Sequence, residues 1–161
     1  MTDETIPLLQ EGDPAPEFTA LTDEATQLSL RDVRGRKVVL YFYPKDDTPG
    51  CTIESCEFRD AHHRFVTTGA VVLGVSPDGV ASHQRFRNKF DLPFTLLADE
   101  DHSIAERYGV WKPKKFMGKE FLGVKRTTFV IDRDGRIAKI FRDVKPQGHA
   151  EEVERALGQV A

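Results

Sequence analysis

Apolar runs and the breaks between them divide the chain into strands and helices. Val38 to Tyr43 is a continuous apolar run, rich in β-branched and aromatic residues, between Gly35 and Pro44. Such a run is typical of a strand that is buried on both faces, as in a parallel sheet. Ala70 to Ser76 has the same character and is followed by a Pro-Asp-Gly break. Both stretches therefore predict buried strands.

Polar stretches with apolar residues at helical spacing predict the helices between these strands. The longest is expected over Thr48 to Thr67. Its expected buried positions are Ile53, Phe58, Ala61 and Phe65. A second helix is expected over Val80 to Phe90, where Phe86 and Phe90 are four residues apart and lie on one face.

Short apolar stretches and turn residues predict the remaining elements. Prolines at the start of residues 12 to 30 disfavour a helix, so this segment is expected to be an extended lead-in with short strands. Asp134-Gly135 between two apolar runs is a strong hairpin signal. The other elements are expected at Phe94–Ala98 (strand), Ser103–Tyr108 (helix), Thr127–Asp132 and Arg136–Phe141 (the two hairpin strands), and Glu151–Leu157 (helix). This order predicts an α/β sandwich with an antiparallel pair added late, in one domain over residues 1–161.

Composition and charge exclude several classes of partner. The 161 residues have the size of one domain, and 39% hydrophobic with 30% charged residues is ordinary for a water-soluble globular protein. A net charge of −3 favours neither nucleic acid nor an anionic membrane. Met1 to Gln10 is polar and acidic, without a signal-peptide pattern, and no apolar run has transmembrane length. We therefore expect a cytoplasmic protein with no nucleic-acid and no membrane partner.

A lysine-rich stretch in the second half is the one local departure from this charge balance. It contains Lys112, Lys114, Lys115 and Lys119. We interpret it as a solvated loop around a docking or structural segment rather than as a polyanion site. The large apolar residues of this region, Trp111, Phe116 and Met117, are interpreted as core or loop anchors rather than as a binding patch.

The only two cysteines, Cys51 and Cys56, follow a tight polar turn. Thr48-Pro49 predicts a helix start, because threonine is a good N-cap and proline is favoured at the first helical position. Cys51 then lies in the first turn, where unpaired N–H groups and the helix dipole favour a thiolate. An activated thiol with a second thiol nearby is typical of a reversible redox centre.

The spacing of the two cysteines restricts how they can react. Five residues along an α-helix give a rise of about 7.5 Å and place the two Cα atoms about 8.6 Å apart. A disulfide needs Cα atoms within about 7 Å of each other. The two thiols therefore cannot form a disulfide while the helix is intact, and the segment from Thr48 to about Glu57 must unwind first.

Two other classes of function compete with a thiol-based enzyme. A metal site would use Cys51, Cys56 and His62 or His63, but the spacing lacks the close Cys-x-x-Cys pairs of structural zinc. A thiol-disulfide oxidoreductase or redox carrier would also normally have a Cys-x-x-Cys motif. We therefore expect no metal and no cofactor, and keep the oxidoreductase as the alternative function.

Motifs in four separate parts of the chain resemble peroxiredoxins. Pro44-x-x-x-Thr48-x-x-Cys51, at the end of a buried strand, resembles their active-site signature. The sequence Phe-Tyr-Pro-Lys-Asp-Asp-Thr-Pro-Gly-Cys-Thr, with Cys56 five residues after Cys51, resembles the Q-type subfamily, also called bacterioferritin comigratory proteins. The other three matching motifs are Gly12-Asp-x-Ala-Pro-x-Phe18, Tyr108-Gly109-Val110-Trp111 and Arg126-Thr-Thr-Phe-Val-Ile-Asp132.

The resemblance implies a fold and an activity. The fold would be thioredoxin-like, with a central mixed β-sheet flanked by helices and an N-terminal extension. The activity would be reduction of hydrogen peroxide and organic hydroperoxides, with thioredoxin or a similar dithiol as the reductant. No second subunit is needed when both cysteines lie in one chain, so we expect a monomer.

The resemblance also implies a role for each site residue. Cys51 matches the peroxidatic cysteine, and Cys56 matches the resolving cysteine of members that carry it in the same helix, where it forms an intramolecular disulfide. Thr48 matches the hydroxyl that contacts the peroxide, Pro44 the proline that shields the pocket, and Arg126 the arginine over the thiolate.

Two carboxylates lie next to this motif. Asp46 and Asp47 would oppose a thiolate if they pointed inward, because like charges repel. We therefore expect both side chains to face solvent.

Overall fold

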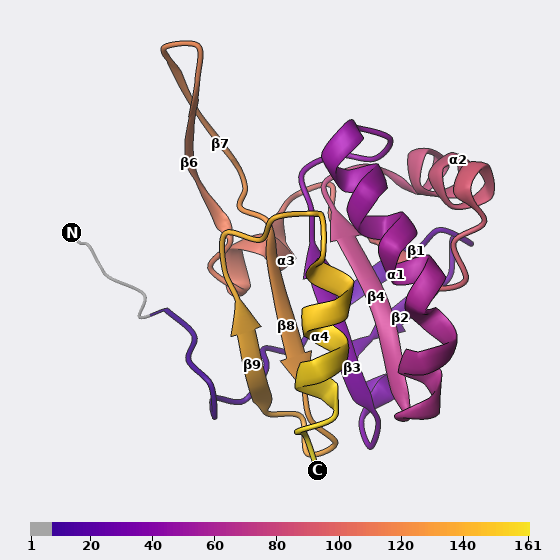
Figure 1. The fold of residues 1–161 in the computed structure, drawn as a ribbon. Coiled ribbons are helices and arrows are strands. Elements are labelled where there is room, and N and C mark those ends of the chain that lie inside the picture. The colour runs from indigo at the N-terminus through magenta and orange to yellow at the C-terminus, as the bar shows by residue number, and fades with distance from the viewer. Residues whose placement is uncertain (1–7) are drawn as a thin grey trace.

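The computed structural model describes residues 8–161 and contains a seven-stranded mixed sheet with the strand order β2-β1-β5-β4-β3-β8-β9 (Figure 1). The strands of this sheet are β1 (Thr19–Thr22), β2 (Gln27–Ser29), β3 (Lys37–Phe42), β4 (Ala70–Ser76), β5 (Thr95–Ala98), β8 (Thr127–Ile131) and β9 (Ile137–Phe141). Strands β3, β4 and β5 are mutually parallel, whereas β8 pairs antiparallel with β3 and β9 antiparallel with β8. The expected central mixed sheet is confirmed.

Helices cover both faces of this sheet. They are α1 (Pro49–Thr67), α2 (Val80–Phe90), α3 (Ser103–Arg107) and α4 (His149–Leu157), with a 3-10 turn η1 (Leu30–Val33). Buried residues of α1, α2 and α4 form one apolar cluster with one face of the sheet, and those of α3 and η1 form a second cluster on the other face. The first face carries the cysteines, because both lie on α1.

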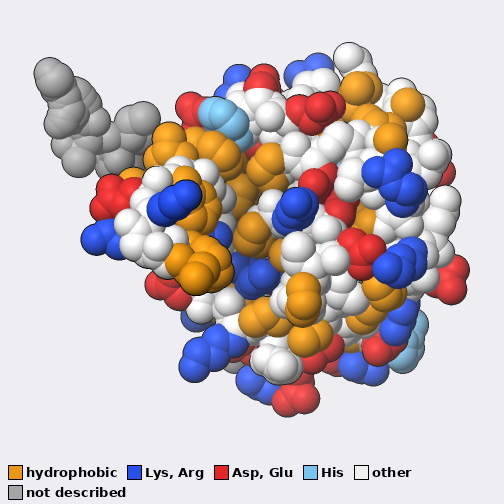
Figure 2. Space-filling model, turned by 90° about the horizontal axis from the view of Figure 1, so that it is seen from above, with side chains coloured by type: hydrophobic (Ala, Val, Ile, Leu, Met, Phe, Trp, Pro, Cys, Tyr) orange, Lys and Arg blue, Asp and Glu red, His pale blue; other side chains and the backbone are white. Residues whose placement is uncertain are grey.

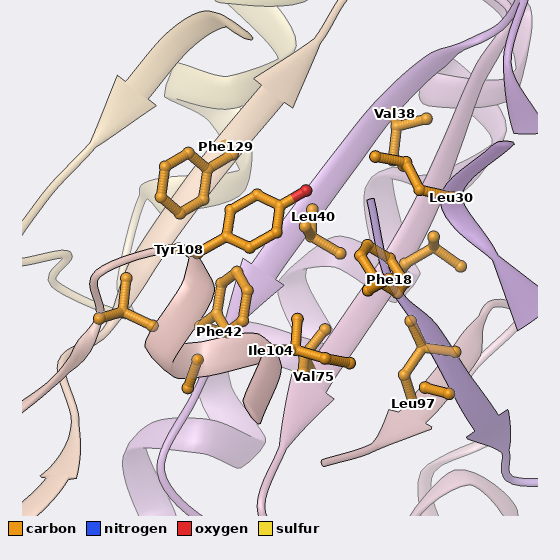
Figure 3. Close-up of a cluster of buried hydrophobic side chains, with 14 of the residues drawn as sticks. Phe18, Leu30, Val38, Leu40, Phe42, Val75, Leu97, Ile104, Tyr108 and Phe129 are labelled. Carbon is orange, nitrogen blue, oxygen red and sulfur yellow. The ribbon is translucent and has the colours of Figure 1, made fainter. Parts of the chain in front are cut away.

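Strand β3 lies at the centre of the fold and leads to the cysteine helix. All six of its residues are buried, which the apolar run from Val38 predicts for five of them. The sixth, Lys37, donates from its buried Nζ to the Leu157 carbonyl at 3.3 Å. On the side of α3, Phe42 packs against Tyr108 and Phe129 with ring centroids 5.4 and 5.8 Å away (Figure 3). Burial of each such ring contributes about 1.5–3 kcal/mol. This aromatic cluster holds the carboxyl end of β3, from which the chain continues towards α1.

The structure corrects the interpretation of the lysine-rich stretch. Residues 111–124 form a hairpin of β6 (Trp111–Phe116) and β7 (Lys119–Val124) that projects from the body of the molecule (Figure 1). Its two-residue turn has Met117 at φ 52° and Gly118 at φ 79°. Two-residue hairpin turns usually carry Asn-Gly or Asp-Gly, so Met-Gly gave no signal in the sequence.

The hairpin also changes the assignment of its large apolar residues. Trp111 is an anchor as expected: it packs against the core and stacks on His102 with ring centroids 4.0 Å apart. Phe116 and Met117 are not anchors, because they are 68% and 86% exposed.

The remaining elements lie close to their predicted bounds. The lead-in over residues 12 to 30 contains the short strands β1 and β2, and Gly109 ends the α3 region at φ 71°. No helix among the described residues combines the length and the apolarity needed to cross a bilayer. Met1 to Pro7, which include most of the segment interpreted as lacking a signal peptide, lie outside the described residues.

Candidate active site

Helix α1 begins where the sequence predicts. Thr48 has the extended backbone of an N-cap, with φ −96° and ψ 156°, and Pro49 is the first helical residue. The Thr48 hydroxyl does not cap the helix, however, and donates instead to the carbonyl of Lys45 at 2.9 Å. The first intrahelical hydrogen bond runs from the Thr52 amide to the Thr48 carbonyl. The amides of Gly50 and Cys51 precede this bond and remain available to an anion at the helix start.

The Cys51 thiol lies next to a guanidinium group. Arg126, in the short connection between β7 and β8, donates from Nη2 to Cys51 Sγ at 3.3 Å and from Nη1 to Glu54 Oε1 at 2.6 Å. Cys51 and Glu54 are both about 1% exposed and share one face of α1. A fixed positive charge next to a sulfur stabilises its ionised form. The structure therefore brings together Cys51 and Arg126, which the sequence placed 75 positions apart.

Glu54 is a site residue that the sequence reasoning missed. Burial raises the pKa of Glu54 to about 7, although the Arg126 charge and hydrogen bond act in the opposite direction. Its second oxygen, Oε2, is buried without a hydrogen-bond partner. The helical pattern favoured Ile53 as the buried position, but Ile53 is only half-buried and Glu54 takes the inward place. The available sequence signal was that Glu54 follows Cys51 by three residues, which places both side chains on the same face of a helix.

We expect Glu54→Gln to change how stability depends on pH. The Glu54 carboxyl is half-protonated near pH 7 in the native state and near its usual pKa of 4.5 in the unfolded state. Between these two pH values the native state therefore binds more protons than the unfolded state. The wild-type free energy of unfolding therefore falls as pH rises through this window, by about 3 kcal/mol in total. The variant should lack this decline. Denaturant unfolding at pH 5, 6, 7 and 8 measures the difference between the two curves.

The exposed Glu24 provides the matched control for this prediction, since Glu24→Gln removes the same charge without changing a buried group. Its stability curve should run parallel to that of the wild type. If the Glu54→Gln curve is parallel as well, the burial of Glu54 has no influence on its protonation and the prediction is wrong.

The expectation for Asp46 is wrong. Asp46 is only 6% exposed, and its carboxylate accepts hydrogen bonds from the Tyr43 hydroxyl at 2.6 Å and the Ser82 hydroxyl at 2.8 Å. Its Oδ2 also lies 2.7 Å from His83 Nδ1. These partners replace the water that a buried carboxylate loses. Asp47 is exposed as expected and forms an ion pair with Lys89 at 2.8 Å.

The contact between Asp46 and His83 ties the loop before α1 to α2. His83 Nε2 lies 2.9 Å from the Leu97 carbonyl, to which it can only donate. The other ring nitrogen, Nδ1, faces the Asp46 carboxylate, so the imidazole bridges the loop and the Leu97 carbonyl through hydrogen bonds on both sides. The loop before α1 is therefore fixed to α2 at Asp46.

The same anchor contains the one cluster of metal-ligand atoms found among residues 8–161. Asp46, Asp78 and His83 offer atoms that all lie within 4.8 Å of one another. These atoms are already engaged: Asp78 Oδ2 accepts from the Asp46 amide at 2.7 Å and from the Ser76 hydroxyl at 2.6 Å, and both ring nitrogens of His83 have partners. The cluster is therefore explained as a hydrogen-bonded anchor.

Cys56 lies on the same unbroken helix and is partly buried, with both cysteines present as free thiols. Burial raises the pKa of the Cys56 thiol, and the nearby Arg59 opposes this shift. Pro44, two residues after the end of β3, and Thr48 are both half-buried. Pro44 and Thr48 therefore lie in the short loop that connects the central strand to Cys51.

Comparisons with known proteins agree on one family. Residues 11–140 match the model of the AhpC/TSA family. A putative peroxiredoxin bcp of Coxiella burnetii is 52% identical over 145 residues, which are 90% of this chain and 96% of that protein. Peroxiredoxin Bcp of Bacillus subtilis is 46% identical over 92% of this chain and 95% of its own length.

Solved structures give the same result. A Xylella fastidiosa PrxQ mutant structure has a TM-score of 0.90 at 36% identity and covers 95% of this chain and 98% of that one. A Xanthomonas campestris bacterioferritin comigratory protein, whose description refers to alkyl peroxide reduction activity, has a TM-score of 0.85 at 39% identity, covering 88% and 90% of the two chains.

Proposed function

Because the chain belongs to the AhpC/TSA family, and within it to the Q-type peroxiredoxins, it is a thiol peroxidase, and we propose that Cys51 is the sulfur that attacks the hydroperoxide. The observation that carries this assignment is the 3.3 Å contact between Arg126 Nη2 and Cys51 Sγ at the start of α1. Cys56 has no comparable position, since it lies more than one turn inside the helix and burial disfavours its thiolate.

In the proposed first step the Cys51 thiolate attacks one oxygen of the hydroperoxide O–O bond. The sulfur loses two electrons and becomes a sulfenic acid, and the other oxygen leaves as an alkoxide or hydroxide that takes up a proton. The developing negative charge needs donors that are already in place. Arg126 and the amides of Gly50 and Cys51 supply them, with Thr48 and Pro44 shaping the approach from the preceding loop.

In the proposed second step the Cys56 thiol attacks the Cys51 sulfenic acid, which releases water and forms an intramolecular disulfide. The helix must first unwind over its first two turns. The burial pattern of α1 supports this step: before residue 58 the buried residues are Cys51, Glu54 and Ser55, whereas Phe58, Ala61 and Phe65 anchor the rest. A segment with few buried apolar contacts opens at low free-energy cost.

We propose that thioredoxin or a similar dithiol protein reduces this disulfide, and that the chain works as a monomer with one domain in the cytoplasm. A dithiol supplies the two electrons and two protons that return both cysteines to thiols. Two cysteines in one chain support the monomer, and a chain of 161 residues with only two cysteines fits a compartment where structural disulfides are rare. The test is peroxide consumption coupled to thioredoxin and its reductase. If peroxide is consumed with dithiothreitol but not with thioredoxin, the proposed reductant is wrong.

We expect a stabilised α1 start to slow disulfide formation. The Gly50 Cβ of a Gly50→Ala variant would lie 3.2 Å from Arg126 Nη2, so that variant would disturb the thiolate contact. Thr52→Ala avoids this conflict and favours the helix by up to about 0.7 kcal/mol. Disulfide formation should slow about threefold while the peroxide step is unchanged, and sulfinic acid should accumulate faster. Stopped-flow fluorescence and intact mass follow the two products.

Thr67→Ala is the matched control, because Thr67 lies in the last turn of α1, outside the segment that unwinds. It should leave both steps unchanged. Amide exchange in the oxidised protein should be faster over residues 50 to 57 and unchanged in β3 and β4. A disulfide form in which α1 stays protected from exchange would refute the unwinding step.

A further inference from the structure

The β6–β7 hairpin has one face that is both basic and aromatic. Directly opposite residues in the register share a face, and faces alternate along each strand. The pairs Lys112↔Gly123, Lys114↔Phe121 and Phe116↔Lys119 therefore place three lysines and two phenylalanines together. We call this set, Lys112, Lys114, Phe116, Lys119 and Phe121, the basic face. It contains no acidic residue, whereas the only hairpin carboxylate, Glu120, lies on the opposite face and pairs with Lys115 at 3.5 Å.

One lysine of the basic face, Lys114, lies at the hairpin base near Cys51. Lys114 folds back towards the hairpin base and donates from Nζ to the Val124 carbonyl at 3.0 Å, two residues before Arg126. Burial lowers the pKa of Lys114, the charges of Lys125 and Arg126 lower it further, and the Cys51 sulfur opposes these effects. The opposite face is used at its base, where Trp111 stacks on His102. At the hairpin base, one face therefore packs on the start of α3, and the other carries Lys114 next to the segment that leads to Arg126.

The exposed tip of the hairpin needs an explanation of its own. Phe116 and Met117 are 68% and 86% exposed, and Phe121 is 48% exposed. Met117 also adopts φ 52°, a left-handed backbone that costs a non-glycine residue about 1–2 kcal/mol and that asparagine tolerates better. An apolar side chain at a strained and exposed position has no role in folding. The hairpin stands out from the body in Figure 1, and the view from above in Figure 2 shows hydrophobic and basic side chains next to one another on this side of the molecule.

Length and charge indicate what kind of partner fits this face. Six residues of strand span about 20 Å, so the tip extends too far for a small hydroperoxide at Cys51 to contact it. Four lysines against one glutamate give residues 111–124 a charge of +3, so the rest of the chain, with −3 in total, carries −6. A basic projection on an acidic body attracts a macromolecule with an acidic surface.

We propose that the basic face of the β6–β7 hairpin docks an acidic dithiol protein, which reduces the Cys51–Cys56 disulfide. The inference rests on the proposed function, because the reductant must approach the edge of the fold at which α1 begins. Thiol-disulfide exchange transfers two electrons and two protons from the partner dithiol, which becomes a disulfide, and releases the thiols of Cys51 and Cys56. The lysines steer the encounter, and Phe116 and Met117 supply apolar contact area.

The test compares two double variants, one on each face of the β6–β7 hairpin. Phe116→Ser/Lys119→Glu changes one apolar residue and one lysine of the basic face, and Leu122→Ser/Lys115→Glu makes the same changes on the other face. With an acidic thioredoxin as reductant, the first variant should lose about tenfold or more in catalytic efficiency, and the wild-type efficiency should fall with added salt. Peroxide consumption driven by dithiothreitol should stay within about twofold in both variants.

Met117→Asn serves as a second variant in case the double change weakens the hairpin. Asparagine suits the turn, so this variant keeps or raises stability and still removes the apolar tip. Its catalytic efficiency should fall when thioredoxin is the reductant and stay unchanged when dithiothreitol is the reductant.

Each other result overturns the docking proposal in a distinguishable way. Equal losses with dithiothreitol and thioredoxin would assign the hairpin to the peroxide step, and equal losses for both faces would exclude a directed surface. If the wild type is a dimer in sedimentation equilibrium and the basic-face variant is a monomer, the basic face binds a second copy of this chain instead. A wild type that thioredoxin does not reduce would refute the proposed reductant itself, whereas a wild type that is reduced as fast as the basic-face variant would refute only the docking.

Discussion

Cys51→Ser is expected to reduce peroxide consumption to the uncatalysed level, with either thioredoxin or dithiothreitol as the reductant. Serine keeps the size of the side chain, but its hydroxyl is not ionised at neutral pH and cannot attack an O–O bond as a thiolate does. Cys56→Ser should still consume one equivalent of peroxide rapidly, because only the second step needs Cys56. A peroxide-coupled assay and a sulfenic-acid probe with mass detection measure both expectations.

The two cysteine variants control for each other, because each removes one thiol from the same helix. The probe should label Cys51 in Cys56→Ser and leave Cys56 almost unlabelled in Cys51→Ser. Labelling of Cys56 at a comparable rate would overturn the assignment of Cys51 as the peroxidatic residue. The oxidised wild type should run as a single chain without reductant, since the proposed disulfide is intramolecular.

The sequence predicted those parts of the fold whose signal is local. The unbroken apolar run of β3 and the Thr48-Pro49 start of α1 each have one explanation, and both are confirmed within a residue or two. The β6–β7 hairpin was missed because its turn is Met-Gly and because Pro113 and four lysines interrupt the alternation that identifies a strand.

The site was harder to predict because burial and charge pairing are set by contacts between distant segments. Asp46 and Asp47 are neighbours of one type, yet one is buried and the other is exposed. Only the packing of α2 decides between them, because it brings Ser82 and His83 to Asp46. Such partners cannot be derived from the loop sequence alone, and without them a buried carboxylate next to a thiolate looks unfavourable.

Glu54 shows the same limitation, and it changes what is expected of Arg126. A buried glutamate in the second turn of α1 is unfavourable unless a cation meets it, and that cation comes from residue 126. One guanidinium therefore serves both the carboxyl group of Glu54 and the thiol of Cys51. Removal of Arg126 affects both groups, so its consequences for stability and for catalysis must be separated experimentally.

Arg126→Met is expected to slow peroxide attack by about 100-fold or more, the effect of removing one charged donor from a preorganised site. Nη2 no longer contacts Sγ, so the sulfur loses its charged hydrogen-bond donor and the charge on the departing oxygen loses a partner. The pKa of Glu54 should rise further, because the Arg126 charge that lowered it is gone. Glu54 then takes a proton at neutral pH, which limits the loss of stability. Stopped-flow rates and thiolate absorbance against pH measure these effects.

Three further variants separate the charge of Arg126 from its geometry and its partner. Arg126→Lys keeps the charge but not the planar fork that reaches two groups, so its attack rate should lie between those of wild type and Arg126→Met. Arg126→Met/Glu54→Gln removes the buried carboxyl as well, and it should recover stability at pH 8 without recovering the attack rate. Lys125→Met removes a neighbouring cation that has no bond to the thiol, and it should change the rate by less than about threefold. If Arg126→Met attacks peroxide as fast as Lys125→Met does, Arg126 acts only as the partner of Glu54 and the proposed thiolate contact has no catalytic role.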